Sequence, residues 1–219
     1  MGNAEKIHWM MKAFHDGGPA MFVIAGVGVM VLCLVLERFF SLRSLTVDKE
    51  AFNENLFAMI LRGELRQAIA YCDKKPVPLT NALKAGLVQV LNRRADDDVQ
   101  VAMDAAVLRE SPRLEGWTGF LAVFGNVATL IGLLGTIMGL IRSFGGVAAL
   151  DPAQKAAELS KGIAEALNCT AFGLGVAIIA IVSYGYFQIR VSRATNDMIE
   201  SSMSLMNLVV SNREKMKGV

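Results

Sequence analysis

The sequence predicts an all-α membrane protein with three transmembrane helices and long helical extensions on one side of the membrane. Of its 219 residues, 53% are hydrophobic and 19% are charged, which is too apolar for an ordinary soluble domain. The charges also avoid three windows, which predict spans over residues 19–36, 117–141 and 166–189. Each window reaches or approaches the roughly 18 to 20 apolar residues that a helix needs to cross a hydrocarbon layer of about 30 Å.

The same composition excludes other classes of protein. A net charge of +2 gives no global basic field to gather nucleic acid, so a nucleic-acid partner is not expected. Three buried core helices of a soluble bundle are the alternative to three spans. Core helices in a chain of this size usually carry a polar face, however, and these windows do not.

Residues 1–18 are predicted to form an amphipathic segment at the membrane surface. His8 and His15 lie seven residues apart, and therefore on one helical face, within an apolar stripe. Such a pair can bind a metal ion, but it more often belongs to an interfacial helix whose two histidines are solvated. The segment lacks the pattern of a cleavable signal peptide, so the first span is expected to remain as an anchor.

The distribution of Lys and Arg orients the spans. In the positive-inside rule the basic residues near span ends face the cytoplasm. The N-terminus and the short connector at 142–165 then lie on the opposite side, and the C-terminal helix at 190–219 is cytoplasmic. The basic residues at the cytoplasmic ends are Arg38, Arg43, Lys49, Arg109, Arg113, Arg190 and Arg193.

Residues 37–116 are predicted to form a cytoplasmic helical region. They hold 12 Lys or Arg and 12 Asp or Glu, with Pro76 and Pro78 separating one helix from the next. Asp96 to Asp98 are expected to cap a further helix and place acidic side chains in its first turn. Helical spacing of apolar residues is seen in three sets: Phe52, Leu56, Met59 and Ile60; Leu83, Leu87, Val90 and Leu91; and Val101, Ala105 and Leu108.

The third span is predicted to extend beyond the membrane as one long helix. A stripe of apolar or small residues continues past the charge-free window to about Ser211, and its spacing is that of one helical face. Its members are Met198, Ser202, Leu205, Met206 and Val209.

No metal, cofactor or enzymatic chemistry is predicted. Cys33, Cys72 and Cys169 have no metal-ligand or paired spacing, which supports neither a zinc site nor a disulfide framework. Neither histidine lies in a span, and no Ser/His pairing occurs at membrane depth.

The second and third spans each carry a stripe of small and weakly polar residues at spacings of three and four. Such a stripe falls on one helical face. Stripes of this kind more often pack one helix tightly against another than line a pore. The members are Gly125, Ala128, Thr129, Gly132, Gly135, Thr136, Gly139 and Ser143 in the second span, and Ala166, Thr170, Gly173, Ala177 and Ala180 in the third.

Thr136 and Thr170 bring hydroxyl groups to apolar depth. A threonine can satisfy itself by bonding the carbonyl one turn back, so either could be structural. No Asp, Glu, His, Lys or Arg occupies the middle of a span, and Glu37 and Glu165 stand only at span ends. The chain by itself therefore has no intramembrane proton carrier.

Two motifs carry a resemblance to a known family. Residues 132–139 with Phe144 resemble the second-helix motif of the MotA/TolQ/ExbB proton-channel family, and residues 162–167 with 170–174 resemble its third-helix motif. Glu37-Arg38-Phe39 at the end of the first span also fits. Three spans and this length point to the ExbB/TolQ branch, because the MotA branch has four spans and a longer chain.

The resemblance implies a homopentamer in a bacterial inner membrane, with the N-terminus periplasmic and the C-terminus cytoplasmic. It implies a pore that surrounds single-span partners of the ExbD/TolR type, each with a membrane Asp, and an effector of the TonB, TolA or gliding type. Coupling to protons rather than sodium is expected. By position, Glu165 would stand at the periplasmic end of the pore, whose lining residues would be Thr136, Thr170, Thr129, Gly132, Gly135, Gly139 and Gly173.

The sequence departs from the family pattern at two places. Thr129 stands where relatives commonly have a proline, which leaves an additional hydroxyl and puts the local kink in question. Asn168 and Cys169 replace the small or aliphatic pair often found before the third-helix threonine. A non-conducting scaffold assembled by small-residue packing stays open as the alternative function.

Overall fold

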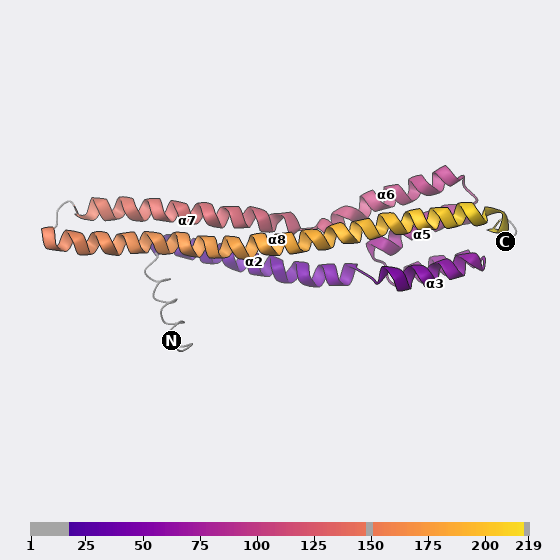
Figure 1. The fold of residues 1–219 in the computed structure, drawn as a ribbon, viewed down its shortest axis with the longest axis horizontal. Helices are drawn as coiled ribbons and strands as arrows, with labels where there is room; N and C mark the ends of the chain where they lie inside the picture. The colour runs from indigo at the N-terminus through magenta and orange to yellow at the C-terminus, as the bar shows by residue number, and fades with distance from the viewer. Residues whose placement is uncertain (1–17, 148–150, 217–219) are drawn as a thin grey trace, which may run out of the picture. The chain divides into compact units, whose positions relative to one another are not determined.

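Helices make up the regular structure of the described part of the chain, residues 18–147 and 151–216 of a computed structural model (Figure 1). For residues 152, 153 and 213–216 only the backbone is described. The predicted N-terminal segment, with His8 and His15, lies outside the described residues except for Gly18. The helices are α2 (Gly18–Leu45), α3 (Lys49–Leu61), α4 (Leu65–Asp73), α5 (Pro78–Leu91), α6 (Asp96–Glu115), α7 (Thr118–Gly146) and α8 (Pro152–Met216).

The chain divides into two compact units. Unit 1 comprises Met1–Glu37 and Trp117–Gly185, and unit 2 comprises Arg38–Gly116 and Tyr186–Val219. Helices α2 and α8 contribute residues to both units, whereas α7 belongs to unit 1 and α3 to α6 belong to unit 2.

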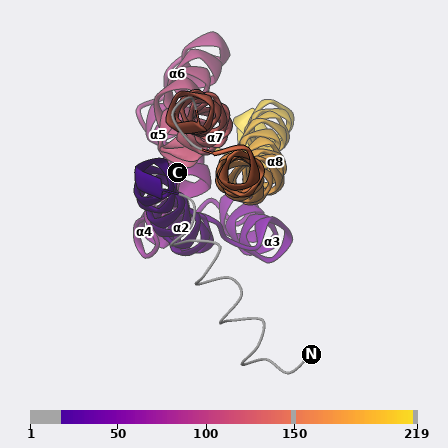
Figure 2. The same cartoon turned by 90° about the vertical axis from the view of Figure 1, so that its left-hand side faces the viewer.

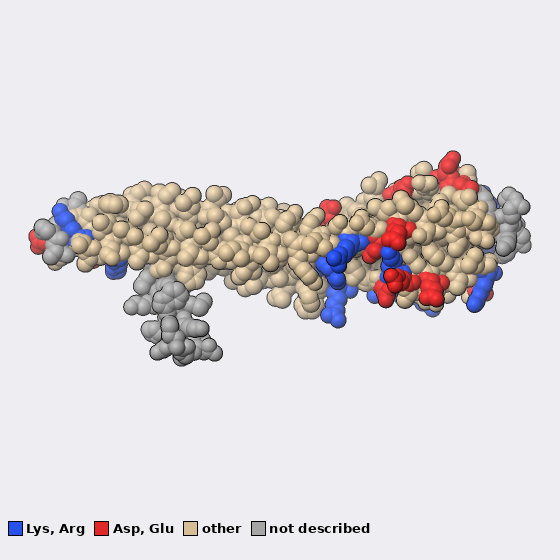
Figure 3. Space-filling view, in the orientation of Figure 1, with Lys and Arg blue, Asp and Glu red and all other residues tan. Residues whose placement is uncertain are grey.

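Unit 1 is built from three helices that lie side by side, as Figures 1 and 2 show for α2, α7 and α8. All three are long and apolar enough to cross a membrane. Only 22% to 28% of their most apolar windows is buried, which excludes the core helices of a soluble bundle because such helices bury their apolar side chains. On the face drawn in Figure 3, charged side chains of unit 1 occur only near the end of α7 and the start of α8. The chain is therefore a multi-pass membrane protein.

Helix α8 is longer than its span requires. It has 65 residues and continues without a break to Met216, which confirms that the third span extends as one helix. Its buried residues beyond the span include Met198, Leu205 and Val209, the stripe that the sequence analysis identified. Most of the predicted connector at 142–165 is helical, because α7 continues to Gly146 and α8 begins at Pro152.

Unit 2 contains four shorter helices whose apolar faces meet. Helix α3 packs on α4, α4 on α5 and α5 on α6, and the core includes Phe52, Leu56, Leu83 and Leu87 from the predicted stripes. The carboxylate of Asp48 accepts hydrogen bonds from the N–H groups of Glu50 and Ala51 at the start of α3. Pro78 opens α5 at a position where its missing N–H costs no helical bond.

The prediction for α6 was wrong in its cap residue and its apolar face. Ala95 is the residue before the helix and makes no side-chain capping bond, whereas Asp96 to Asp98 form the acidic first turn. Val101 and Leu108 are 66% and 75% exposed. The buried face instead carries Val99, Met103, Ala106, Val107, Glu110 and Leu114.

The end of α6 is held by a buried arginine. Arg38 is only 3% exposed and donates to the carbonyl oxygens of Leu114 at 3.5 Å and Glu115 at 3.3 Å. Gly116 follows with φ of 42°, and a Cβ there would overlap the Arg38 guanidinium. Because the last carbonyls of a helix have no partner within it, this cation stabilises the C-terminal end of α6.

Cys72 gives a chemical test of the unit 2 core. Burial raises the pKa of its thiol from 9.0 to about 12, with a smaller contribution from Asp73. That difference lowers the thiolate fraction at pH 8 about a thousandfold. In a chain with Cys33→Ala and Cys169→Ala, maleimide should label Cys72 far more slowly when the protein is folded than in denaturant. Equal rates in the two states would contradict the buried position.

Candidate functional site

The backbones of α7 and α8 approach closely at two facing glycines. A Cβ on Gly132 would lie 3.2 Å from the carbonyl oxygen of Cys169 and 3.3 Å from the Cα of Gly173. A Cβ on Gly173 would lie only 2.7 Å from the carbonyl oxygen of Ala128. Glycine at Gly173 is required for this separation, and glycine at Gly132 relieves a tight contact, as in other small-residue contacts between membrane helices.

The contact continues along the same face of α7. A Cβ on Gly135 would meet the Cβ of Cys169 at 3.0 Å and that of Ala20 on α2 at 3.1 Å. A Cβ on Gly139 would meet Ala166 at 3.0 Å. The small-residue stripes of the two spans therefore face each other within one chain.

This approach brings the two predicted hydroxyls together. Thr136 Oγ1 and Thr170 Oγ1 are hydrogen-bonded to each other across the helices. Both hydroxyl oxygens also lie 3.1 Å from the carbonyl oxygen of Gly132, and Thr136 Oγ1 lies 3.2 Å from the carbonyl oxygen of Ala166. Because each hydroxyl has one proton, one threonine donates to the other and the second donates to a carbonyl oxygen. Both side chains are only partly buried, so the pair retains an accessible side.

Thr129 lies away from this pair. Its Oγ1 donates to the carbonyl oxygen of Gly125 at 3.2 Å, a bond within α7. Seven residues separate it from Thr136, a rise of about 10 Å along a helix. Of the two departures in the third span, Cys169 is buried in the α7–α8 contact and Asn168 is half-buried.

Glu165 stands at the other end of the stripe, beside the first residue of α2. A Cβ on Gly18, whose φ is +67°, would overlap Glu165 Oε1. The N-terminus of a helix favours a nearby carboxylate because its N–H groups carry partial positive charge. Glu165 also lines a cavity of about 320 Å³ whose other walls are mainly apolar and include Val23, Leu134 and Met138.

Two residues at this end were missed by the sequence analysis as site residues. Arg142 lines the same cavity as Glu165. Gly162 packs so closely against Ser143 that a Cβ there would overlap the serine hydroxyl. The signal for Gly162 was present, since it opens the third-helix motif and Ser143 belongs to the stripe of the second span.

Within residues 18–147 and 151–216, no group of three or more His, Cys, Asp or Glu side chains is placed to hold a metal ion. The polar groups gathered in the contact are hydroxyls and backbone carbonyls. Such groups can accept or donate hydrogen bonds, but they do not titrate near neutral pH.

Comparison with known proteins agrees with the motifs. Residues 74–200 match the model of the MotA/TolQ/ExbB proton channel family. The chain belongs to this family. The matched region covers both motif-bearing helices, α7 and the part of α8 up to Glu200.

The relatives lie in the ExbB/TolQ branch. The Tol-Pal system protein TolQ of Pseudomonas aeruginosa is 30% identical over 182 residues, which cover 78% of this chain and 77% of that protein. Biopolymer transport protein exbB1 of Vibrio cholerae is 29% identical over 194 residues, which cover 86% of this chain and 81% of that protein. TolQ of Haemophilus influenzae is 40% identical over 98 residues, 44% and 42% of the two chains.

The α7–α8 contact predicts different effects for two nearby glycines. Gly173→Ala should lower the free energy of unfolding by about 1–3 kcal/mol, because the new methyl group meets backbone. Gly175→Ala is the matched control, since nothing lies within 4 Å of its Cβ position and alanine favours a helix. Thermal unfolding in detergent measures both variants. Equal destabilisation by the two substitutions would contradict the close contact.

Proposed function

We propose that the chain is the channel subunit of a proton-driven energising motor in a bacterial inner membrane. The observation that carries the proposal is the bonded pair Thr136 and Thr170 in a part of the protein without charged side chains. In the proposed assembly five copies surround a central pore lined by α7 and α8. Membership of the proton-channel family supports this arrangement.

The proton carrier is proposed to come from a partner. No Asp, Glu, His, Lys or Arg occupies the middle of a span in this chain, so its residues alone offer no carrier for a proton across the membrane. A single-span partner of the ExbD/TolR type would supply one Asp within the pore. A charged carboxylate at this depth is costly and its protonated form is much less so. Protonation would therefore change which position of the partner is favoured.

The threonine pair suits such an Asp in either state. A hydroxyl can donate to a carboxylate and accept from a protonated acid. In the pentamer each subunit would present one pair, so five pairs would offer near-equivalent positions to the partner helices. The membrane potential, about 2.3 kcal/mol per charge per 100 mV, would bias the order in which they are visited.

Gly132, Gly135, Gly139 and Gly173 would act by setting the helix separation that holds the pair. Thr129 would add a hydroxyl farther along the path, and Glu165 would stand at the periplasmic mouth.

The positive-inside distribution of Lys and Arg supports a periplasmic N-terminus and a cytoplasmic C-terminus. The motor would act on an effector of the TonB, TolA or gliding type, and the TolQ and exbB1 relatives support the first two.

A hydroxyl deletion tests the proposed role of the pair. Thr170→Val is near-isosteric and should reduce proton flux at least about tenfold, the effect of one lost hydrogen bond of about 1.4 kcal/mol at the barrier. Flux is measured with a pH-sensitive dye in liposomes that contain the chain and its partner. Ser183→Ala removes a hydroxyl from the same span outside the motif and should leave flux within about twofold.

Assembly must be followed in the same variants, because Thr170 also bonds across the helices. The oligomer mass of Thr170→Val should equal that of the original chain. Undiminished flux through an assembled Thr170→Val variant would count against the proposed role.

A non-conducting scaffold is the second candidate function, and the glycine contacts between α7 and α8 favour it. It requires only the packing that these residues provide. The two candidates differ in one measurable property. A scaffold gives no proton flux above background in liposomes even when the partner is present.

The pentamer has its own test. Five copies of a 23.6 kDa chain give a protein mass of about 118 kDa. Native mass spectrometry of the detergent-solubilised chain should give that mass. A monomer or dimer under conditions that preserve the helical circular-dichroism signal would contradict the pentamer.

A further inference from the structure

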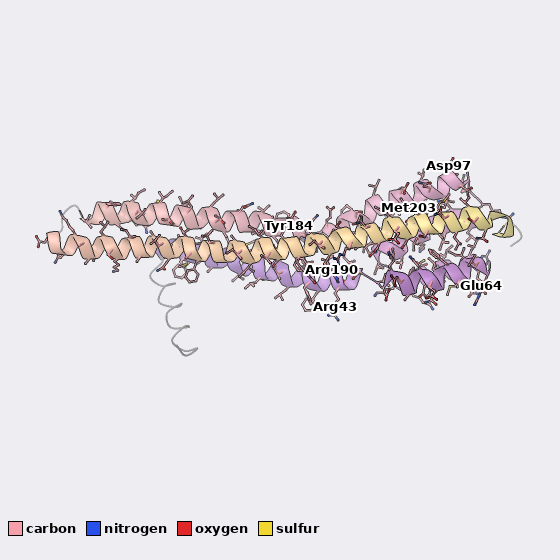
Figure 4. The ribbon with its side chains drawn as sticks, in the orientation of Figure 1. Arg43, Glu64, Asp97, Tyr184, Arg190 and Met203 are labelled. Atoms are coloured by element: carbon pink, nitrogen blue, oxygen red, sulfur yellow. The ribbon has the colours of Figure 1, made fainter. Side chains whose placement is uncertain are left out.

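A small cationic groove lies between α2 and α8 in unit 2. Its volume is about 160 Å³, and it is lined by Phe39, Leu42, Arg43, Tyr186, Phe187 and Arg190. Leu42 and Phe187 are buried and form its floor, whereas both arginines are exposed at its rim. Figure 4 labels Arg43 on α2 and Arg190 on α8, and Figure 3 shows basic side chains gathered there.

The two positive charges are not neutralised by neighbouring residues. Within the described residues, no carboxylate oxygen lies within 4.0 Å of either guanidinium group. The acidic residues that follow on α8, Asp197 and Glu200, are held instead by Lys49 at 3.3 Å and 2.8 Å. The groove therefore presents two like charges from two helices to whatever fills it. An anion would relieve their mutual repulsion.

The groove also stands where a lipid headgroup would be. Arg190 directly follows the charge-free window of the third span. Arg43 comes seven residues after Leu36, which is the last residue of the first span. Tyr186 and Phe39 are 54% and 46% exposed. Aromatic side chains of this kind lie at the boundary between hydrocarbon and headgroups. A volume of 160 Å³ equals about five water molecules, which suits a headgroup rather than an acyl chain.

We propose that this groove binds the phosphate of an anionic phospholipid. The guanidinium groups of Arg43 and Arg190 would each donate to phosphate oxygens, and the first carbons of the acyl chains would lie against Phe39 and Tyr186. Arginine suits this role because its planar donors match phosphate oxygens. The lipid would bridge α2 and α8. The proposal depends on the chain crossing a membrane and is independent of proton conduction.

The test is a lipid titration of the full chain in detergent, read by the thermal unfolding temperature. Phosphatidylglycerol should raise this temperature in a saturable way, whereas phosphatidylcholine with the same acyl chains should not. Inorganic phosphate at the same concentration should neither raise the temperature nor compete. Stabilisation by both lipids alike, or by phosphate alone, would overturn the assignment.

Substitutions locate the effect. Arg43→Gln with Arg190→Gln should raise the Kd for phosphatidylglycerol about thirtyfold, because each basic side chain near an anionic surface contributes a factor of about five. Arg62→Gln, an exposed arginine at the C-terminal end of α3 and outside the groove, is the matched control and should stay within about twofold of the original Kd. If the double variant does not fold, each single Arg→Gln variant should show about a fivefold loss. Equal losses in Arg62→Gln and the groove variants would overturn the proposal.

Discussion

The close approach of α7 and α8 at Gly132 and Gly173 is the constraint on which the rest of unit 1 depends. A Cβ on Gly173 would collide with backbone of the facing helix, and a Cβ on Gly132 would be in tight contact with it. With glycine at both positions, the hydroxyls of a threonine on each helix are hydrogen-bonded to each other, and both lie 3.1 Å from the carbonyl oxygen of Gly132. The close packing of the two helices is therefore also what brings the two hydroxyls together. The same stripe that joins the helices places two hydroxyl groups within the apolar spans.

The second constraint is the absence of charge in the spans. An intramembrane carboxylate would give this chain a carrier of its own, at a cost of several kcal/mol while it remained ionised. The hydroxyl pair carries no such cost, but it can only shape a path for a proton that another molecule brings. In the proposed mechanism the chain provides the static wall, and its partner carries the titratable group.

Much of the fold follows from the placement of charges in the sequence. Three charge-free windows predict three spans, and the stripe from Met198 to Val209 predicts the long extension of α8. The cap of α6 was misplaced by one residue, because an acidic run can occupy either the cap or the first turn. The helical start of α8 was missed since its residues 154–165 are polar, and a search for apolar windows does not detect them. A stripe of small residues has the same spacing whether it packs or lines a pore. Only the structure shows that Gly132 faces Gly173.

In the proposed mechanism this chain conducts protons only together with a partner's carboxylate. This mechanism is tested most directly by measuring proton flux under an imposed membrane potential in three sets of liposomes: the chain alone, the chain with its single-span partner, and the chain with the partner's membrane Asp changed to Asn. Flux is expected in the second set and none above background in the other two. Flux through the chain alone, or through the complex that lacks the Asp, would contradict it.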